Sequence, residues 1–285
     1  MSTRLCNDTE TKSGRFAVAT LVSKDYCLGA LNLLASLDSN LKYPFDVLVY
    51  DIDLSDNFKK ILYRAAPSVN FRSIEPAAYR DIDMSSTIPH LRSSFYKLEM
   101  FKETAYDRIL FVDADAIVLR DISMLFEIPC KFGACEAYDR KRDRIVRSEF
   151  NGGVLLLSRE VMQEEVYVQL MNSAIRGDVY MRFAEQGVLN AYFQHTVHWL
   201  PKLFNVEKRF FLSESHRSIF DAAHIVHYVN EKPWAKKKSD LSMVGSEAPW
   251  FAKLAQLEDS DISAALLEMS TTVQTFDERL AQWIR

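Results

Sequence analysis

The sequence predicts an α/β fold, in which helices flank a β-sheet. Two observations support this prediction. Short runs of β-branched and aromatic residues alternate along the chain with longer segments of helical periodicity, as is typical of βαβ units. The 285 residues are 48% hydrophobic and 26% charged, which is an ordinary globular composition with enough chain to bury a large core.

The first part of the chain alternates strands and helices. Residues 1–15 are polar and are expected to form a disordered tail. The apolar run FAVATLV at 16–22 predicts the first buried strand. After it we expect, in this order, a helix at 25–37, a strand at 45–53, a helix at 58–65, a short strand at 69–74 and a helix at 92–104. This order indicates parallel strands connected by helices.

The chain beyond residue 121 has a different character. We expect Asp121 to cap a short helix at 122–127. A strongly charged stretch at 139–149 separates two strand signals, of which the second is FNGGVLLLS at 150–158. The domain is completed by three further elements, which are helices near 160–175 and 183–193 and a strand at 224–229.

Residues 241–285 are expected to form a C-terminal helical segment. From Asp261 onward, apolar residues recur at alternating spacings of four and three, which places them on one helix face: Ile262, Leu266, Met269, Val273, Phe276, Leu280 and Trp283. We expect this face to pack on the core, and a contact in a homodimer is the alternative. The polar side holds more acids than bases, which argues against membrane binding.

Composition excludes several classes of protein. The net charge is −4 and the bases are mostly interleaved with acids, so nothing indicates nucleic-acid binding. No apolar run approaches the ~18 residues that a membrane span needs, and the N-terminus lacks the apolar core of a signal peptide. The four cysteines form no CxxC pair, so we expect free thiols in a reducing compartment. The expectation is a cytoplasmic protein.

The stretch RILFVDADAIVLRD at 108–121 is the most informative part of the sequence. Asp113 and Asp115 interrupt a run of buried strand residues, although a buried carboxylate needs a partner or a metal ion. Residues two apart in an extended chain point to the same side, so both carboxylates can face one point. Such oxygen ligands suit Mg²⁺ or Mn²⁺, with positions left for substrate phosphates. On this stretch alone, the alternative is that the two aspartates only cap a turn.

The remaining candidates for a nucleotide site are basic or metal-ligating side chains. The sequence contains neither GxGxxG nor a Walker loop, so a nucleotide would be held by a metal and by basic residues. His227 lies on the strand at 224–229, where it could complete a divalent-metal site or simply belong to the core. Lys232 follows it, beside a proline and a tryptophan that could fix its direction.

Polar residues also stand at the ends of two other elements. Asn151 precedes two glycines at the start of a strand, where the chain either lets a ligand approach closely or makes a simple turn. Glu185 and Gln186 lie in the first turn of the helix at 183–193. At this position Glu185 is either a catalytic residue or a structural one, since an acid in the first turn interacts favourably with the helix dipole.

Taken in order, these segments resemble glycosyltransferase family 8, the family of glycogenin and galactinol synthase. The resemblance covers about residues 16–235 and is carried by TLVSKDYCLGALNLLASL, FYKLEMF, ILFVDADAIVL, FNGGVLLLS, FAEQGVLNAYF, LPKLFN and HIVHYVNEKPW. It implies a GT-A fold over 16–240, with a single Rossmann-like mixed sheet. It also implies retaining transfer of a hexose from a UDP-sugar, UDP-glucose or UDP-galactose, with Mn²⁺ or Mg²⁺, to a hydroxyl acceptor such as a sugar, polyol or glycan.

The resemblance also implies roles for individual residues, carried over by position. The metal ligands would be Asp113, Asp115 and His227. Lys232 would hold the diphosphate, and Lys97 would approach the donor from the preceding helix. The uridine pocket would be lined by Thr20, Leu21 and Tyr26, with Ala114 and Gly152 as further donor contacts. The groups at the reacting centre would be Asn151, Glu185 and Gln186, with Glu136 as a weaker candidate.

This sequence departs from glycogenin in two places. Glycogenin-like members have Asp-Gln where Glu185 and Gln186 stand here, and the Glu-Gln form is more similar to galactinol synthases. Between Asn205 and His224 there is no tyrosine, although glycogenins carry their self-glucosylated tyrosine in that region, so self-priming is not expected. The charged stretch beginning at Asp139 could border the acceptor or could simply be solvated.

Two other functions are compatible with an Asp-x-Asp strand. One is a nucleotide-sugar-binding protein of the same fold without catalysis. The other is a haloacid dehalogenase-like phosphatase, which would normally open with its Asp-x-Asp strand and carry Gly-Thr or Gly-Val after it, whereas Ala116 and Ile117 follow here. For the transferase, the sequence leaves open whether retention arises on one face of the sugar or by double displacement through Glu185.

Overall fold

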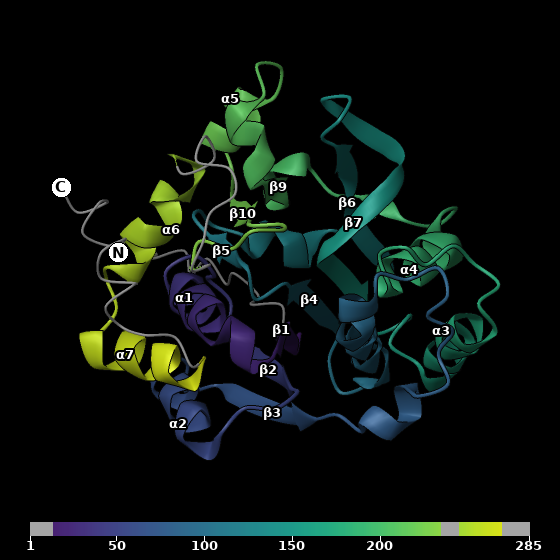
Figure 1. Cartoon of the computed structure of the whole chain (residues 1–285), viewed down its shortest axis with the longest axis horizontal. Coiled ribbons are helices and arrows are strands. Elements are labelled where there is room, and N and C mark those ends of the chain that lie inside the picture. Colours follow the sequence, from purple (N-terminus) through teal and green to yellow (C-terminus); the bar gives the residue numbers. More distant parts are fainter. Residues whose placement is uncertain (1–13, 235–244, 270–285) are drawn as a thin grey trace, which may run out of the picture.

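The computed structural model describes residues 14–234 and 245–269. Seven strands form the main sheet in the order β3-β2-β1-β4-β7-β6-β8 (Figure 1). Their bounds are Phe16–Val22 (β1), Asp46–Asp51 (β2), Val69–Ser73 (β3), Arg108–Val112 (β4), Phe132–Asp139 (β6), Arg144–Ser158 (β7) and His198–Trp199 (β8). Strands β3, β2, β1 and β4 are parallel, whereas β7 is antiparallel to β4 and β6. The predicted α/β fold with a mixed sheet is confirmed.

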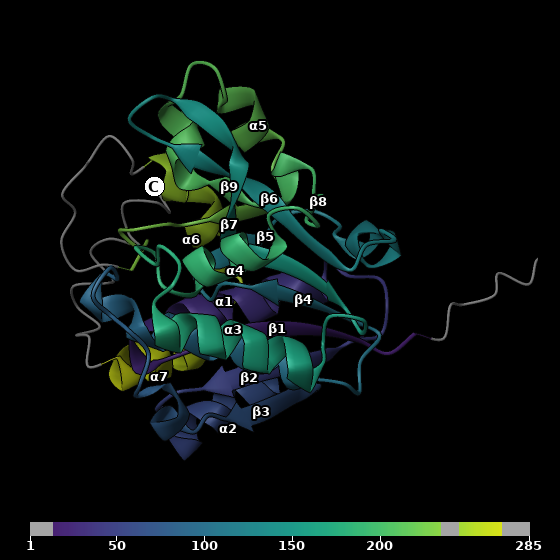
Figure 2. The ribbon, with the colours of Figure 1, turned by 90° about the vertical axis from the view of Figure 1, so that its right-hand side faces the viewer.

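Helices cover both faces of this sheet (Figure 1 and Figure 2). One face carries α1 (Cys27–Asp38), α2 (Asp56–Ala65), α6 (Ala248–Leu254) and α7 (Asp259–Glu268), and the other carries the 3₁₀ helix η3 (Pro89–Lys102), α3 (Glu164–Arg176) and α4 (Glu185–Phe193). Because strand residues alternate between the faces, Val18 and Leu110 enter the core under α1 while Ala19 and Ile109 enter the core under η3. Among the described residues, no helix combines the length and apolarity that crossing a bilayer requires.

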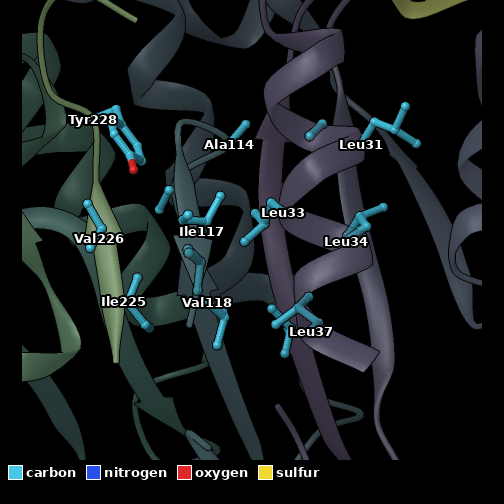
Figure 3. Packing of buried hydrophobic residues seen from close by; sticks show 14 of the residues in the cluster. Leu31, Leu33, Leu34, Leu37, Ala114, Ile117, Val118, Ile225, Val226 and Tyr228 are labelled. Atoms are coloured by element: carbon cyan, nitrogen blue, oxygen red, sulfur yellow. The ribbon is translucent and has the colours of Figure 1, made fainter. Parts of the chain in front are cut away.

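A second, smaller sheet lies beside the main one and was not predicted. It contains β5 (Ala116–Val118), β10 (Ile225–His227) and β9 (Val206–Glu207), in that order. The chain turns after β4, where the N–H of Ala116 donates to the Asp113 carbonyl at 2.9 Å. Strand β5 therefore leaves the main sheet and pairs antiparallel with β10. Figure 3 shows β5 packed between α1 and β10 through Ile117 and Val118.

Two other segments differ from their predicted form. Residues 139–149 are the end of a β6–β7 hairpin, which contains register shifts around Glu136. The helix expected at 92–104 consists of 3₁₀ turns, and the Ser94 hydroxyl donates to the Leu91 carbonyl three residues earlier at 2.6 Å. The short helices of the described chain are η1 (Lys24–Tyr26), η2 (Pro76–Tyr79), η4 (Ser123–Glu127), η5 (Lys202–Phe204), η6 (Lys208–Leu212) and α5 (Arg217–Asp221).

The N-cap of η4 is Ile122, one residue after Asp121, so Asp121 is not itself the cap that the sequence predicted, although its side chain bonds the first turn. The Asp121 carboxylate accepts the N–H of Ser123 at 2.8 Å, which satisfies a donor in the first turn.

The C-terminal helix α7 packs against α1 and α2. Ile262 and Leu266 are buried in the core under α1. The Glu268 carboxylate accepts the N–H of Ser55 at 2.9 Å and its hydroxyl at 2.7 Å, and Ser55 is the N-cap of α2. The other members of the predicted apolar face, Val273, Phe276, Leu280 and Trp283, lie outside the described residues. Division of the chain at residues 15 and 240, and the homodimer contact, stay predictions.

Helix α1 also supports the turn between β4 and β5. A Cβ atom added at Gly29 would lie 2.4 Å from the Ala114 carbonyl oxygen and 2.4 Å from the ring of Trp234. Glycine is needed here because the helix approaches the turn closely. The turn that carries Asp113 and Asp115 is thus packed directly against the helix of the first βα unit.

Candidate active site

A cleft of about 1120 Å³ opens at the carboxyl ends of β1 and β4. This edge of a parallel sheet is where α/β proteins usually bind ligands. Nearly all of the predicted site residues line the cleft, namely Leu21, Tyr26, Lys97, Asp113, Ala114, Asp115, Asn151, Gly152, Glu185, Gln186, His227 and Lys232. The fold therefore collects into one cleft residues that lie on separate strands, helices and turns.

Two predicted residues are not among those that line the cleft. Thr20 is buried within β1, where its side chain points away from the cleft that the next residue, Leu21, faces. Its hydroxyl has no hydrogen-bond partner within the described chain. The Glu136 carboxylate lies 3.9 Å from the exposed Arg147 guanidinium on the neighbouring strand. These positions do not support the side-chain contacts that the resemblance implied for Thr20 and Glu136.

Asp113, Asp115 and His227 converge at one point of the cleft. His227 Nε2 lies 3.2 Å from a carboxylate oxygen of Asp115 and 3.6 Å from one of Asp113. One atom from each of the three side chains can be chosen so that all lie within 4.8 Å of one another. The sequence predicted that the two carboxylates face one point. The imidazole joins them because β10 pairs with β5, which places His227 opposite Ala116, the residue that follows Asp115.

The charge of Asp115 is compensated although the side chain is only 4% exposed. The Lys232 ammonium donates to one carboxylate oxygen of Asp115 and, at 3.3 Å, to the Tyr228 carbonyl. Burial alone raises the pKa of Asp115, but attraction to Lys232, and to His227 when its ring is protonated, outweighs burial and holds this pKa below its usual range. Asp115 is therefore ionised, as a metal ligand must be.

A second buried lysine connects the metal-ligating turn to α4. The Lys97 ammonium lies 2.8 Å from Asp113 Oδ1 and 2.9 Å from Glu185 Oε1. Burial lowers the pKa of Lys97, but the two carboxylates outweigh burial and raise it above its usual value. Because one ammonium serves two carboxylates, Glu185 is only partly compensated, and burial raises the Glu185 pKa.

Glu185 lines the cleft and has one carboxylate oxygen without a hydrogen-bond partner in the described chain. The side chain is 3% exposed, and its second oxygen, Oε2, is buried without a hydrogen-bond partner within the described chain. The residue before it, Ala184, has φ of 52° and ψ of −128°, a conformation that costs roughly 1–3 kcal/mol outside glycine. A strained turn beside a buried, incompletely bonded carboxylate that lines a cleft is typical of a ligand-binding position.

Helix α4 also fixes the backbone of β7 where it enters the cleft. Gln186 accepts the N–H of Gly152 through its side-chain oxygen at 2.9 Å. Asn190, one turn further along, bonds both backbone groups of Phe150, at 2.8 and 3.0 Å. The oxygen of Gln186 is therefore used to hold the chain, which leaves its amide NH₂ group for a ligand.

Sequence reasoning missed two residues that position His227. Asn205 is completely buried, and its side chain lies between Asn151 and His227. A Cβ atom at Gly153 would lie 2.2 Å from the His227 ring, so this glycine makes room for the imidazole. Asn205 belongs to the quoted segment LPKLFN, but only the pairing of β9 with β10 places it beside His227.

The hydrogen bonds around Asn205 define which ring nitrogen of His227 carries the proton. The N–H of Gly153 donates to Asn151 Oδ1 at 2.9 Å, so that oxygen is an acceptor. Asn205 must then donate to it through Nδ2, at 3.0 Å, which turns Asn205 Oδ1 toward His227 Nδ1 at 3.1 Å. An amide oxygen can only accept, so Nδ1 is protonated in the neutral ring and the lone pair of Nε2 faces the two carboxylates.

This arrangement fits a divalent metal ion. Three electron-pair donors, two carboxylate oxygens and the Nε2 nitrogen, face one another, and a metal ion between them would relieve the mutual repulsion that Lys97 and Lys232 offset only in part. Mixed oxygen and nitrogen ligands suit Mn²⁺, and the oxygen ligands also suit Mg²⁺. Asn205 would supply the outer hydrogen bond that metal-ligating histidines commonly make.

Comparison with known proteins agrees with this geometry. The model of the family described as "Glycosyl transferase family 8" matches residues 17–238, which is most of the chain. The chain belongs to glycosyltransferase family 8. The match includes nearly all of the main sheet, the small sheet and every residue that lines the cleft, since all of the lining residues fall between 17 and 238.

Relatives and solved structures of the family are distant in sequence. Glycogenin of Neurospora crassa is 25% identical over 278 residues, and the match covers 96% of this chain but 35% of that protein. Galactinol synthase 1 of Solanum lycopersicum is 24% identical over 255 residues, covering 81% of this chain and 77% of that one. This chain therefore spans about a third of the Neurospora glycogenin.

Solved structures show the same fold. The galactosyltransferase LgtC, in complex with donor and acceptor sugar analogs, superposes with a TM-score of 0.66 at 17% identity, covering 85% of this chain and 96% of LgtC. The bifunctional glycosyltransferase WbbM gives 0.67 at 18% identity, covering 90% of this chain and 52% of WbbM. The family 8 chain has the GT-A fold, as the resemblance implied.

We predict that Asn205→Leu weakens Mn²⁺ binding by about 10- to 100-fold, the usual effect of removing the outer partner of a metal-ligating histidine. The free Mn²⁺ signal in electron paramagnetic resonance measures this affinity without turnover. Asn205→Asp keeps an acceptor for Nδ1 and is expected to retain most of the affinity, and Asn172→Leu, at an exposed position of α3, is the matched control. A folded Asn205→Leu protein with wild-type Mn²⁺ affinity would contradict the assigned role of Asn205.

Proposed function

We propose that this chain is a retaining hexosyltransferase. It moves a hexose from a UDP-sugar, UDP-glucose or UDP-galactose, to a hydroxyl group of an acceptor, with Mn²⁺ or Mg²⁺ as cofactor. The observation that carries the proposal is the convergence of Asp113, Asp115 and His227 with two buried lysines in one cleft of a family 8 fold. Galactinol synthase and the galactosyltransferase LgtC, among the proteins it resembles, support a hexosyl donor.

Different residues of the cleft would contact the diphosphate and the uridine of the donor. Asp113, Asp115 and His227 would hold the divalent ion, which supplies positive charge to the donor diphosphate when bound. Lys232 lies beside Asp115 and would add a second positive charge at the diphosphate, where negative charge grows as the sugar leaves. Leu21, near the end of β1, and Tyr26, in η1, would contact the uridine.

The transfer exchanges one bond at the anomeric carbon for another. The acceptor hydroxyl oxygen forms a bond to this carbon, and the bond from the carbon to the β-phosphate oxygen breaks. The electron pair of the broken bond leaves with UDP, and the hydroxyl proton passes to the departing diphosphate on the same face of the sugar. Attack and departure on one face retain the configuration without an enzyme nucleophile.

Glu185 would orient the donor sugar. Its carboxylate lines the cleft and can accept a hydroxyl of the sugar, and Gln186 and Asn151 line the same cleft. A double displacement through Glu185 would need a second carboxylate as acid and base. The neighbouring carboxylate is Asp113, which shares Lys97 with Glu185 and belongs to the metal site, so we favour the single-face route.

The proposed function predicts UDP release in the presence of Mn²⁺, measured with four donors: UDP-glucose, UDP-galactose, UDP-xylose and UDP-glucuronate. We expect one hexose donor to be preferred, and Asp115→Asn or excess chelator to reduce release by at least about 100-fold, because charge stabilisation at the diphosphate is lost. Asp56→Asn, at an exposed position of α2, is the control. Failure of the wild-type protein to release UDP from any of the four donors would contradict the proposed function.

A substitution at Glu185 distinguishes transfer on one face of the sugar from double displacement. Glu185→Gln removes the charge of one hydrogen-bond acceptor, so kcat/KM for the preferred donor should fall about 10- to 100-fold. Glu165→Gln, on the exposed face of α3, should have no effect. A fall of about 10⁴ or more, as expected when a covalent nucleophile is removed, would instead favour double displacement.

A further inference from the structure

The β6–β7 hairpin carries a run of alternating charges that the fold separates. Residues 139–144 read Asp-Arg-Lys-Arg-Asp-Arg, which looks like a solvated loop of mixed charge in sequence. In the structure these residues form the hairpin end, which rises beside α5 at the edge of the cleft (Figure 1). The two acids and the four bases of this run have different surroundings.

The carboxylate of the first acid of the run, Asp139, accepts hydrogen bonds within the turn that it begins. Its carboxylate accepts the N–H of Lys141 at 3.0 Å and the N–H of Arg142 at 3.4 Å. The Arg142 guanidinium also donates to it at 3.0 Å. Asp139 therefore closes the hairpin, and its charge is compensated locally.

The second acid, Asp143, anchors the hairpin to the segment before α5. Its carboxylate accepts the Ser213 hydroxyl at 2.6 Å and the Tyr138 hydroxyl, and it lies 3.3 Å from His216 Nδ1. The Tyr138 ring packs against Phe210, with centroids 4.5 Å apart. Asp143 itself has φ of 46°, which an aspartate tolerates in a turn. The hairpin is thus fixed in position by the side of the turn that faces α5.

The bases of the run lie on the other side and line the cleft. Arg140, Lys141, Arg142 and Arg144 all contribute to its wall, whereas Asp143 does not. The acids that line the cleft from this hairpin are Asp139, already bonded to Arg142, and Glu149. Further along the wall, Arg209 is paired with Glu207 at 3.2 Å. The hairpin therefore gives one edge of the cleft an excess of positive charge, which attracts anions.

We propose that this hairpin edge, defined by Lys141 and Arg144, binds the negative charge of an anionic acceptor, a sugar or polyol that carries a phosphate or carboxylate beside its reacting hydroxyl. The inference rests on the proposed function, since it concerns the acceptor of the same cleft. The donor diphosphate has its own cations, the metal ion held by Asp113, Asp115 and His227 together with Lys232. Lys141 and Arg144 line the cleft from the β6–β7 hairpin, whereas the donor cations are held by the β4–β5 turn, β10 and the segment after it, so we assign the charge of the hairpin to the second substrate.

The test uses isothermal titration of the full chain saturated with Mn²⁺ and UDP, so that the donor cations are occupied. The probes are glucose, glucose 6-phosphate and glucuronate, which share a ring and differ in charge. We expect at least one charged sugar to bind about tenfold or more tightly than glucose, the effect of one charge-assisted hydrogen bond. The preference should weaken with added salt because the hairpin is exposed.

The hairpin variant is Lys141→Gln/Arg144→Gln, and Arg80→Gln, exposed and outside the cleft, is its matched control. We expect the double variant to lose the preference for the charged sugar and the control to keep it. A preference for glucose 6-phosphate alone assigns a phosphate, and a preference for glucuronate alone assigns a carboxylate.

Three results would overturn the proposal: equal binding of charged and neutral sugars, no binding of either charged sugar, or a preference that the double variant retains. The UDP titration that precedes the sugars keeps the two hypotheses apart. If UDP with Mn²⁺ does not bind, the proposed donor site is wrong. If UDP binds and no charged sugar is preferred, only the acceptor inference is wrong.

Discussion

The placement of a buried and a half-buried carboxylate, Asp115 and Asp113, at the turn between β4 and β5 is the constraint on which the rest of this molecule depends. Asp115 is almost inaccessible to solvent, and a buried charge is tolerated only with partners. The partners come from separate parts of the chain: Lys97 from η3, His227 from β10 and Lys232 from the segment after it. Holding them together requires both sheets and both helical layers, so the fold and the site are specified by the same contacts.

A further layer of residues makes this convergence possible. Gly29 lets α1 reach the turn, and Gly153 makes room for the His227 ring. Asn205 fixes the ring through a chain of hydrogen bonds that begins at a backbone N–H, so its direction does not depend on a freely rotating group. Ala184 holds a strained backbone that directs Glu185 inward. Such support is expected where precise geometry matters more than local stability.

The sequence predicts the order of strands and helices, and most of the cleft residues, because these features are local. Apolar periodicity marks β1 and α1, and the i, i+2 spacing of Asp113 and Asp115 places both carboxylates on one side. The role of Asn205 could not be predicted, since it depends on the two-residue strand β9 pairing with β10. Thr20 was placed by resemblance alone, and its neighbour Leu21 faces the cleft instead. The charges of the hairpin are separated only by tertiary contacts of Asp143.

The most direct test of the account is the coordination of Mn²⁺ in the presence of UDP, measured by electron–nuclear double resonance. If the three residues hold a metal that binds the donor diphosphate, the Mn²⁺ signal will show coupling to a ¹⁴N nucleus and to ³¹P nuclei. His227→Ala should remove the nitrogen coupling. Mn²⁺ that binds the protein without coupling to nitrogen or phosphorus would contradict the claim that Asp113, Asp115 and His227 form the donor site.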